Sequence, residues 1–258
     1  MTEINFPTDL HKRATIVLTE FFLDQLNVDT ILLVNSLATG NATPDSDIDV
    51  AVLVPATTSA TETVRLERLW DEFLHSDPTL IQFRMSSRFA HIHLDIFDGD
   101  YKPAAWEDGG PIDAFELEIG NQIRYSTPLA AEGSRFKELK SKWLPYYGDE
   151  LQSERLELAR ASCLYELDHV PVFVNRDLHF HAFDRLYVAF QKFLQTLFIK
   201  HKTYPIAYNK WIKHQVADIL GLPPLYEVLP GIISVHSLTG PAIIQKAAAL
   251  ASIVDEYC

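Results

Sequence analysis

The sequence has few cysteines and no long apolar run. Its two cysteines are Cys163 and Cys258, which argues against a disulfide framework and favours a reducing compartment. No uninterrupted apolar run reaches the roughly 18–20 residues that a membrane-spanning helix needs. The first residues, MTEINFPTDLHKR, lack the basic and apolar segments of a secretory signal. We therefore expect a cytoplasmic protein that makes no membrane contact.

Positive charge is also scarce. The chain has 22 Lys and Arg residues against 35 Asp and Glu residues, which gives a net charge of −13 at pH 7. Proteins that hold a nucleic-acid polymer draw most of their affinity from basic side chains on phosphates. The sequence contains no dense Lys/Arg cluster, so we expect no nucleic-acid polymer as a partner. A small phosphorylated molecule held through metal ions is compatible with this charge.

The hydrophobic pattern describes a globular chain, since 47% of its residues are hydrophobic. Apolar residues at helical spacing predict two helices in the N-terminal half, over residues 9–26 and 61–76. Short apolar or alternating runs predict strands over residues 30–34, 48–54, 79–85, 90–97 and 121–126.

The pattern becomes mostly helical after residue 130. One or two helices are expected around Pro145, and the aromatic-rich segment 183–202 is predicted to be a buried central helix. The layout therefore predicts an α+β fold with two domains, an α/β domain over residues 1–130 and an all-helical bundle domain over residues 131–258.

Two carboxylates lie one residue apart at the start of a predicted strand, in the segment SDIDVAVLV. Strand residues alternate between faces, so Asp47 and Asp49 project from the same face. Two carboxylates placed in this way repel each other unless a cation lies between them. Mg²⁺ is the natural candidate, because it takes hard oxygen ligands and often binds one or two carboxylates together with substrate phosphates.

A third carboxylate occurs within a later predicted strand, HIHLDIF. Asp95 stands there between Leu94 and Ile96, where an unpaired charge would be costly. If this strand lies beside residues 48–54, Asp95 completes a cluster of three carboxylates. Such a cluster can hold two metal ions for an in-line phosphoryl displacement.

This arrangement resembles the nucleotidyltransferase superfamily of the DNA polymerase beta type. The family signature is Gly-Ser, a short spacer, Asp-x-Asp and a later Asp. Here the matching positions are Asn35-Ser36, Asp47-Ile48-Asp49 and Asp95. The segment from FDRLYVAF to YNKWI is also similar to the helical domains of bacterial small-molecule, aminoglycoside-like adenylyltransferases. The resemblance implies a small mixed sheet flanked by helices, followed by a helical domain that closes over the substrate.

The resemblance also implies roles for individual residues. Asp47, Asp49 and Asp95 would hold two Mg²⁺ ions, and Asp95 would help to activate the acceptor hydroxyl. Ser36, with the backbone at Asn35, would hold the phosphates of ATP or another nucleoside triphosphate. Lys210, in YNKWI, matches a helical-domain lysine that reaches the triphosphate, a role that suits a point charge. The implied reaction moves a nucleoside monophosphate, AMP from ATP, onto a hydroxyl of a small molecule.

Several positions leave alternatives open. Asn35 replaces the family glycine, whose backbone adopts φ > 0 and lets phosphate approach closely; Asn tolerates that region better than most residues. The substitution is either tolerated in an active enzyme or weakens the binding of the triphosphate. His91 and His93 share a strand face with Asp95. The two histidines could form a transition-metal site, or they could be solvated strand residues. A general base must lie within hydrogen-bond reach of the acceptor hydroxyl, and Glu166 and Asp168 are the candidates.

Asn35 also motivates a second hypothesis for the function. The protein could be non-catalytic or regulatory, as a nucleotide sensor or as one component of a toxin–antitoxin pair with a protein partner. A third version, in which the enzyme modifies a hydroxyl of a protein, uses the same residues. Fold alone does not decide between these functions.

Overall fold

The computed structural model describes residues 4–104, 110 and 112–258. Contacts within the chain define two compact units, and we describe each by itself. The sheet unit comprises the chain up to Tyr101 together with Asn121–Pro145, and the helical unit comprises Lys102–Gly120 together with Tyr146–Cys258. The boundary expected near residue 130 rested on the change in pattern alone, whereas the chain leaves the sheet unit at Tyr101, returns at Asn121 and leaves again after Pro145.

The sheet unit combines helices with four strands, which confirms the predicted α+β class. Its helices are α1 (Asp9–Leu23), α2 (Asn35–Ala38), α3 (Ala60–Leu74), α4 (Pro78–Arg84) and α6 (Ser134–Trp143). Its strands are β1 (Thr30–Leu33), β2 (Ile48–Leu53), β3 (Ile92–Phe97) and β4 (Thr127–Pro128).

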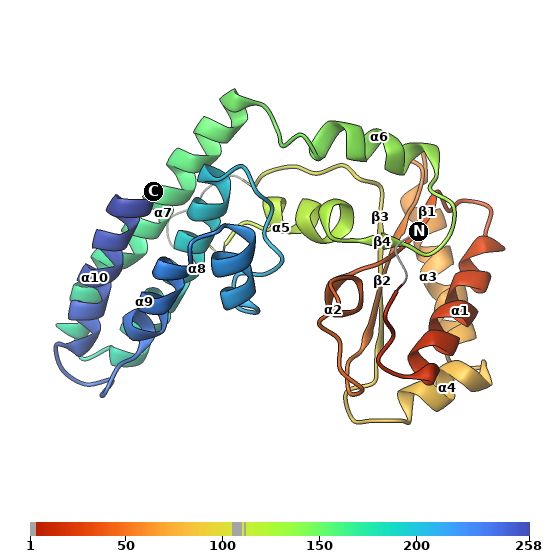
Figure 1. Ribbon diagram of the computed structural model, residues 1–258, viewed down its shortest axis with the longest axis horizontal. Helices are drawn as coiled ribbons and strands as arrows, with labels where there is room; N and C mark the ends of the chain where they lie inside the picture. The colour runs from red at the N-terminus through yellow and green to blue at the C-terminus, as the bar shows by residue number, and fades with distance from the viewer. Residues whose placement is uncertain (1–3, 105–109, 111) are drawn as a thin grey trace. The chain divides into compact units, whose positions relative to one another are not determined.

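The four strands form a mixed sheet in the order β3-β2-β1-β4. Strand β2 is antiparallel to β1 and parallel to β3, while β4 pairs antiparallel with β1. Helices α1, α3 and α4 lie beside this sheet (Figure 1) and form one core with it. Every second residue of β2 faces that core, beginning with Ile48 and Val50. The residues between them, including Asp49, therefore project from the opposite face of the sheet.

The predicted strand over residues 79–85 is wrong, because Pro78–Arg84 forms helix α4. Asp77 precedes this helix and its carboxylate accepts hydrogen bonds from the backbone N–H groups of Thr79 and Leu80, at 2.8 and 3.0 Å. Pro78 occupies the first helical position, where its missing N–H costs nothing. Capping at the start of the segment thus outweighs the alternation that suggested a strand.

The predicted strand over residues 121–126 is also wrong. Gly120–Arg124 forms a π-helical turn, and Ser126 Oγ donates to the carbonyl of Gln122 at 2.8 Å. The strand follows this turn, as the two-residue β4 that pairs with Leu32 and Leu33.

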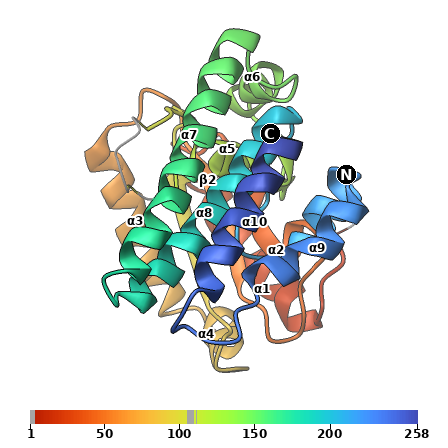
Figure 2. The same ribbon diagram turned by 90° about the vertical axis from the view of Figure 1, so that its left-hand side faces the viewer.

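The helical unit consists of helices and the loops between them. The helices are α5 (Phe115–Ile119), α7 (Asp149–Val174), α8 (His179–Lys200), α9 (Pro223–Ile233) and α10 (Ala242–Tyr257), with a π-helical segment at His214–Ile219. Helices α7, α8 and α10 run side by side (Figure 2) and share the largest apolar core of the unit. Phe193, Leu197 and Phe198 of α8 are buried in full or nearly so, which confirms the predicted central helix.

Asp29 ties helix α6 to the sheet. Its carboxylate accepts hydrogen bonds from the backbone N–H groups of Arg135 and Phe136, both at 3.0 Å, and from Thr30 Oγ1 at 2.9 Å. Gly133 packs against the same carboxylate so closely that a Cβ there would lie 2.3 Å from Asp29 Cγ. The first turn of α6 therefore depends on one side chain from another part of the chain.

We expect Asp29→Ala to lower the free energy of unfolding by about 2 kcal/mol, because it removes a helix cap made of charge-assisted hydrogen bonds. Urea unfolding followed by tryptophan fluorescence measures this, since Trp143 lies at the end of α6. The exposed Asp24 gives a matched control, and Asp24→Ala should change stability by less than about 0.5 kcal/mol. Equal effects of the two substitutions would contradict the capping role.

Candidate functional site

Two carboxylates lie on the sheet face that helices α1, α3 and α4 leave uncovered. Asp49 is the second residue of β2, and Asp47 immediately precedes the strand. Both side chains are partly exposed, while Ile48 between them is fully buried in the core. The alternation of the strand therefore places Asp47 and Asp49 together at one open position, as the sequence predicts.

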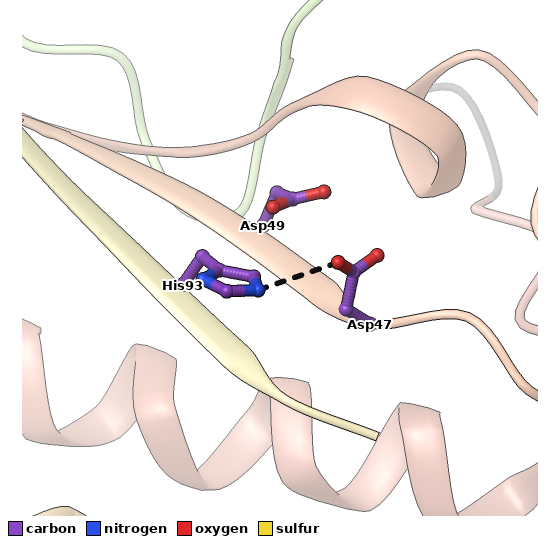
Figure 3. Close-up of side chains that lie close together, drawn as sticks. All are labelled: Asp47, Asp49 and His93. Atoms are coloured by element: carbon purple, nitrogen blue, oxygen red, sulfur yellow. Dashed lines mark ion pairs between the residues drawn. The ribbon is translucent and has the colours of Figure 1, made fainter. Parts of the chain in front are cut away.

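His93 completes this position from the neighbouring strand. In the parallel register of β2 and β3, His93 lies directly opposite Asp49. One ligand atom each from Asp47, Asp49 and His93 can be chosen so that all three lie within 4.8 Å of one another. Figure 3 shows the imidazole of His93 turned toward Asp47, with Nε2 3.4 Å from the Asp47 carboxylate.

Asp95 lies one step further along the same face. It is opposite Ala51, and its carboxylate accepts a hydrogen bond from Gln122 Nε2 at 2.6 Å. Tyr101 in turn donates to Gln122 Oε1 at 2.9 Å. The structure thus brings Asp47 and Asp49 together with His93 and holds Asp95 against the amide of Gln122.

The loop before β2 begins with an unusual backbone conformation. Asn35 has φ +55°, the left-handed region that glycine adopts freely and Asn tolerates. It opens the short helix α2, in which Ser36 Oγ is buried and has no hydrogen-bond partner within residues 4–104, 110 and 112–258. The asparagine therefore takes the kind of backbone conformation that a glycine would supply at this position.

His11 positions the loop that leads to Asp47. It lies in α1, is 1% exposed, and donates from Nε2 to the carbonyl of Ser46 at 3.0 Å. Thr8 Oγ1 lies 2.8 Å from its other ring nitrogen. The hydrogen bond from His11 to the Ser46 carbonyl fixes the end of the loop, one residue before Asp47. In the sequence, this role of His11 is indicated only by its place on the inward face of a predicted helix.

The side chains present suit a divalent cation. Two carboxylates on one face supply oxygen donors, and the imidazole supplies a nitrogen donor. Because Asp47 and His93 are 39% and 60% exposed, the position is open to solvent and to a substrate. A cation bound there would relieve the repulsion between Asp47 and Asp49.

The helical unit holds the other residues singled out from the sequence. Lys210 is exposed in the loop after α8, and its Nζ lies 6.0 Å from the centre of the Trp211 ring. Glu166 is fully buried and accepts hydrogen bonds from Lys192 at 2.7 Å and Arg185 at 2.5 Å. Its oxygens are thus committed to two cations of the helical core, whereas Asp168 on the same helix is exposed.

A pocket of about 570 Å³ opens within the helical unit. Charged residues in its lining include Arg155, Lys192 and Asp113, and the apolar part includes Phe115 and Leu158. The volume falls in the range of small-molecule sites. Arg155 and Lys192 are 5% and 2% exposed, and they pair with the buried carboxylates of Glu116 and Glu166.

No helix within the described part of the chain is long and apolar enough to cross a membrane. No curated protein matches the chain. Residues 17–105 match the family model of the nucleotidyltransferase domain, a segment that contains β1 to β3 and Asp47, Asp49, His93 and Asp95. The similarity to the nucleotidyltransferase domain therefore covers residues 17–105 of the chain.

Proposed function

We propose that this protein is a metal-dependent nucleotidyltransferase that moves AMP from ATP onto a hydroxyl of a small molecule. The observation that supports the proposal is the pair Asp47 and Asp49 on the open face of the sheet, inside the matched domain. The two carboxylates by themselves favour Mg²⁺. Asp95 stays a candidate for a second ion, since it lies further along the same face.

The reaction forms a bond between the acceptor oxygen and the α-phosphorus, while the bond from that phosphorus to the departing pyrophosphate breaks. The hydroxyl proton passes to a base, for which Asp168 remains a candidate. A bound divalent ion supplies a positive charge that offsets the charge of the triphosphate and of the leaving group. Asp47 and Asp49 would hold that ion, and the Ser36 hydroxyl, which has no hydrogen-bond partner among the described residues, would contact a phosphate.

The pocket of the helical unit supports a small acceptor. Its wall includes buried charged groups, such as Arg155 and Lys192, and apolar side chains such as Leu158. A polar molecule with an apolar part fits this lining better than a flat hydrocarbon does. Lys210 stays a candidate contact for the triphosphate. We propose no nucleic-acid polymer as the acceptor, because the net charge is −13.

The test uses ATP carrying a label at either the α- or the γ-phosphate, with a library of small hydroxyl compounds. We expect the α-label to appear on an acceptor and the γ-label to appear in pyrophosphate. Leu158→Trp, which fills part of the pocket from a 39% exposed position, should raise the KM for the acceptor and leave ATP binding unchanged. Metal-dependent ATP binding without transfer to any compound would instead favour the regulatory alternative, and label on a protein would favour a protein acceptor.

A further inference from the structure

We propose that His93 is a direct ligand of the metal ion, and that it makes this site prefer first-row transition ions such as Mn²⁺, Co²⁺ or Zn²⁺ over Mg²⁺. The inference rests on the proposed function, since it concerns the ion that Asp47 and Asp49 would hold. In this proposal His93 is the third ligand of the ion, and Asp95 lies outside the group of residues that bind it directly.

The register of the two parallel strands carries this assignment. His93 lies directly opposite Asp49, while Asp95 lies opposite Ala51. Neighbouring strands are about 4.8 Å apart and two residues span about 6.6 Å along a strand. Asp95 is therefore only a diagonal neighbour of Asp49, and it is a further pair away from Asp47. His93 is the β3 residue that can approach both carboxylates at once.

The hydrogen bonds of the two side chains point the same way. The Asp95 carboxylate is engaged by Gln122 Nε2 at 2.6 Å, and Gln122 is itself fixed by Tyr101. By contrast, His93 Nε2 is turned toward the Asp47 carboxylate, 3.4 Å away. One oxygen of the Asp95 carboxylate is thus held toward Gln122, whereas His93 already directs a nitrogen into the group.

The chemistry of imidazole sets the expected preference. A neutral imidazole nitrogen suits transition ions, while Mg²⁺ prefers oxygen ligands and gives up its water reluctantly. Two carboxylates and one imidazole therefore form a mixed donor set. The imidazole adds little affinity for Mg²⁺ and more affinity for ions later in the series from Mn²⁺ to Zn²⁺. With His93 as the third ligand, the site should therefore favour transition ions more than a site made of carboxylates alone would.

His91 provides a matched control. It lies on the same face of the chain two residues before His93, is exposed, and has its ring centre 5.9 Å from that of His93. It is not part of the group formed by Asp47, Asp49 and His93. Replacing either histidine by alanine removes the same chemical group from neighbouring positions.

The experiment titrates the untagged full-length protein with Co²⁺, followed by visible absorption, and with Mn²⁺, followed by electron paramagnetic resonance. The titrations use the wild type, His93→Ala, His91→Ala and Asp47→Asn, each checked for folding by circular dichroism. We expect His93→Ala to weaken Co²⁺ binding at least about tenfold and to change Mg²⁺ competition by less than about threefold. His91→Ala should stay within about twofold of the wild type for every ion.

The outcomes separate this inference from the proposed function. If His93 serves only as a counter-charge for Asp47, His93→Ala will leave Co²⁺ affinity unchanged or raise it, and the inference is overturned. Loss of metal binding in Asp47→Asn together with that result would leave the proposed metal site intact. If Asp47→Asn binds every ion as the wild type does, both the proposed function and the role of His93 are overturned.

Discussion

Asp49→Asn should reduce nucleotidyl transfer by at least about a thousandfold, because it removes a ligand of an ion that contributes several kcal/mol to the transition state. Asparagine keeps the size of the side chain and one oxygen but loses the charge. The position is partly exposed on β2, so the strand and the core behind it should remain folded. The measurement is the initial rate of pyrophosphate release at saturating ATP.

Stability should change in the opposite direction from activity. Without metal, Asp47 and Asp49 repel each other from adjacent positions on one face, and the Asp49→Asn substitution would remove that repulsion. We expect the free energy of unfolding at pH 8 to rise by roughly 0.5 kcal/mol. Asp45→Asn, two residues before Asp47 and exposed, is the control and should alter neither quantity. An Asp49→Asn protein that retains more than a tenth of the wild-type rate would exclude Asp49 as a metal ligand.

The sequence was sufficient to predict the paired carboxylates, because alternation along a strand is a local property. Ile48 and Val50 had to face the core, so Asp47 and Asp49 had to share the other face. It was not sufficient to choose between His93 and Asp95. That choice depends on the register between two strands about 40 residues apart, which no local pattern specifies.

The two misassigned segments show the limits of periodicity over short windows. In α4, Leu80 and Phe83 are buried three residues apart, a helical spacing that the shorter alternating pattern had hidden. The signal that could have identified the helix was Asp77-Pro78, a capping residue followed by a proline at the first helical position. At Gly120–Arg124 the turn leads into a strand of only two residues, which is shorter than any pattern that periodicity can resolve.

The buried charges of the helical unit were not predicted from the sequence, and they account for the second large effect. Glu116 is fully buried in α5 and receives hydrogen bonds from Arg155 Nε and Nη2 at 2.9 and 2.8 Å. Tyr147 and Gln195 donate to the same carboxylate, at 2.9 and 3.0 Å. Burial, together with the negative charge of Glu116, raises the pKa of Tyr147 well above its usual value, so the phenol stays a donor. Arg155 also pairs with Asp113.

Glu116→Gln should therefore destabilise the helical unit by about 3 kcal/mol or more, because it leaves the Arg155 guanidinium buried with one of its two anions gone. Thermal unfolding of the full-length chain measures the loss. Glu154→Gln makes the same chemical change at the exposed position beside Arg155 and should shift stability by less than about 0.5 kcal/mol. Replacing both partners, as Glu116→Leu with Arg155→Met, should recover part of the loss, since apolar side chains of similar volume need no counter-ion. If the double variant is instead less stable than either single variant, the network contributes more through its hydrogen bonds to Tyr147 and Gln195 than through the ion pair.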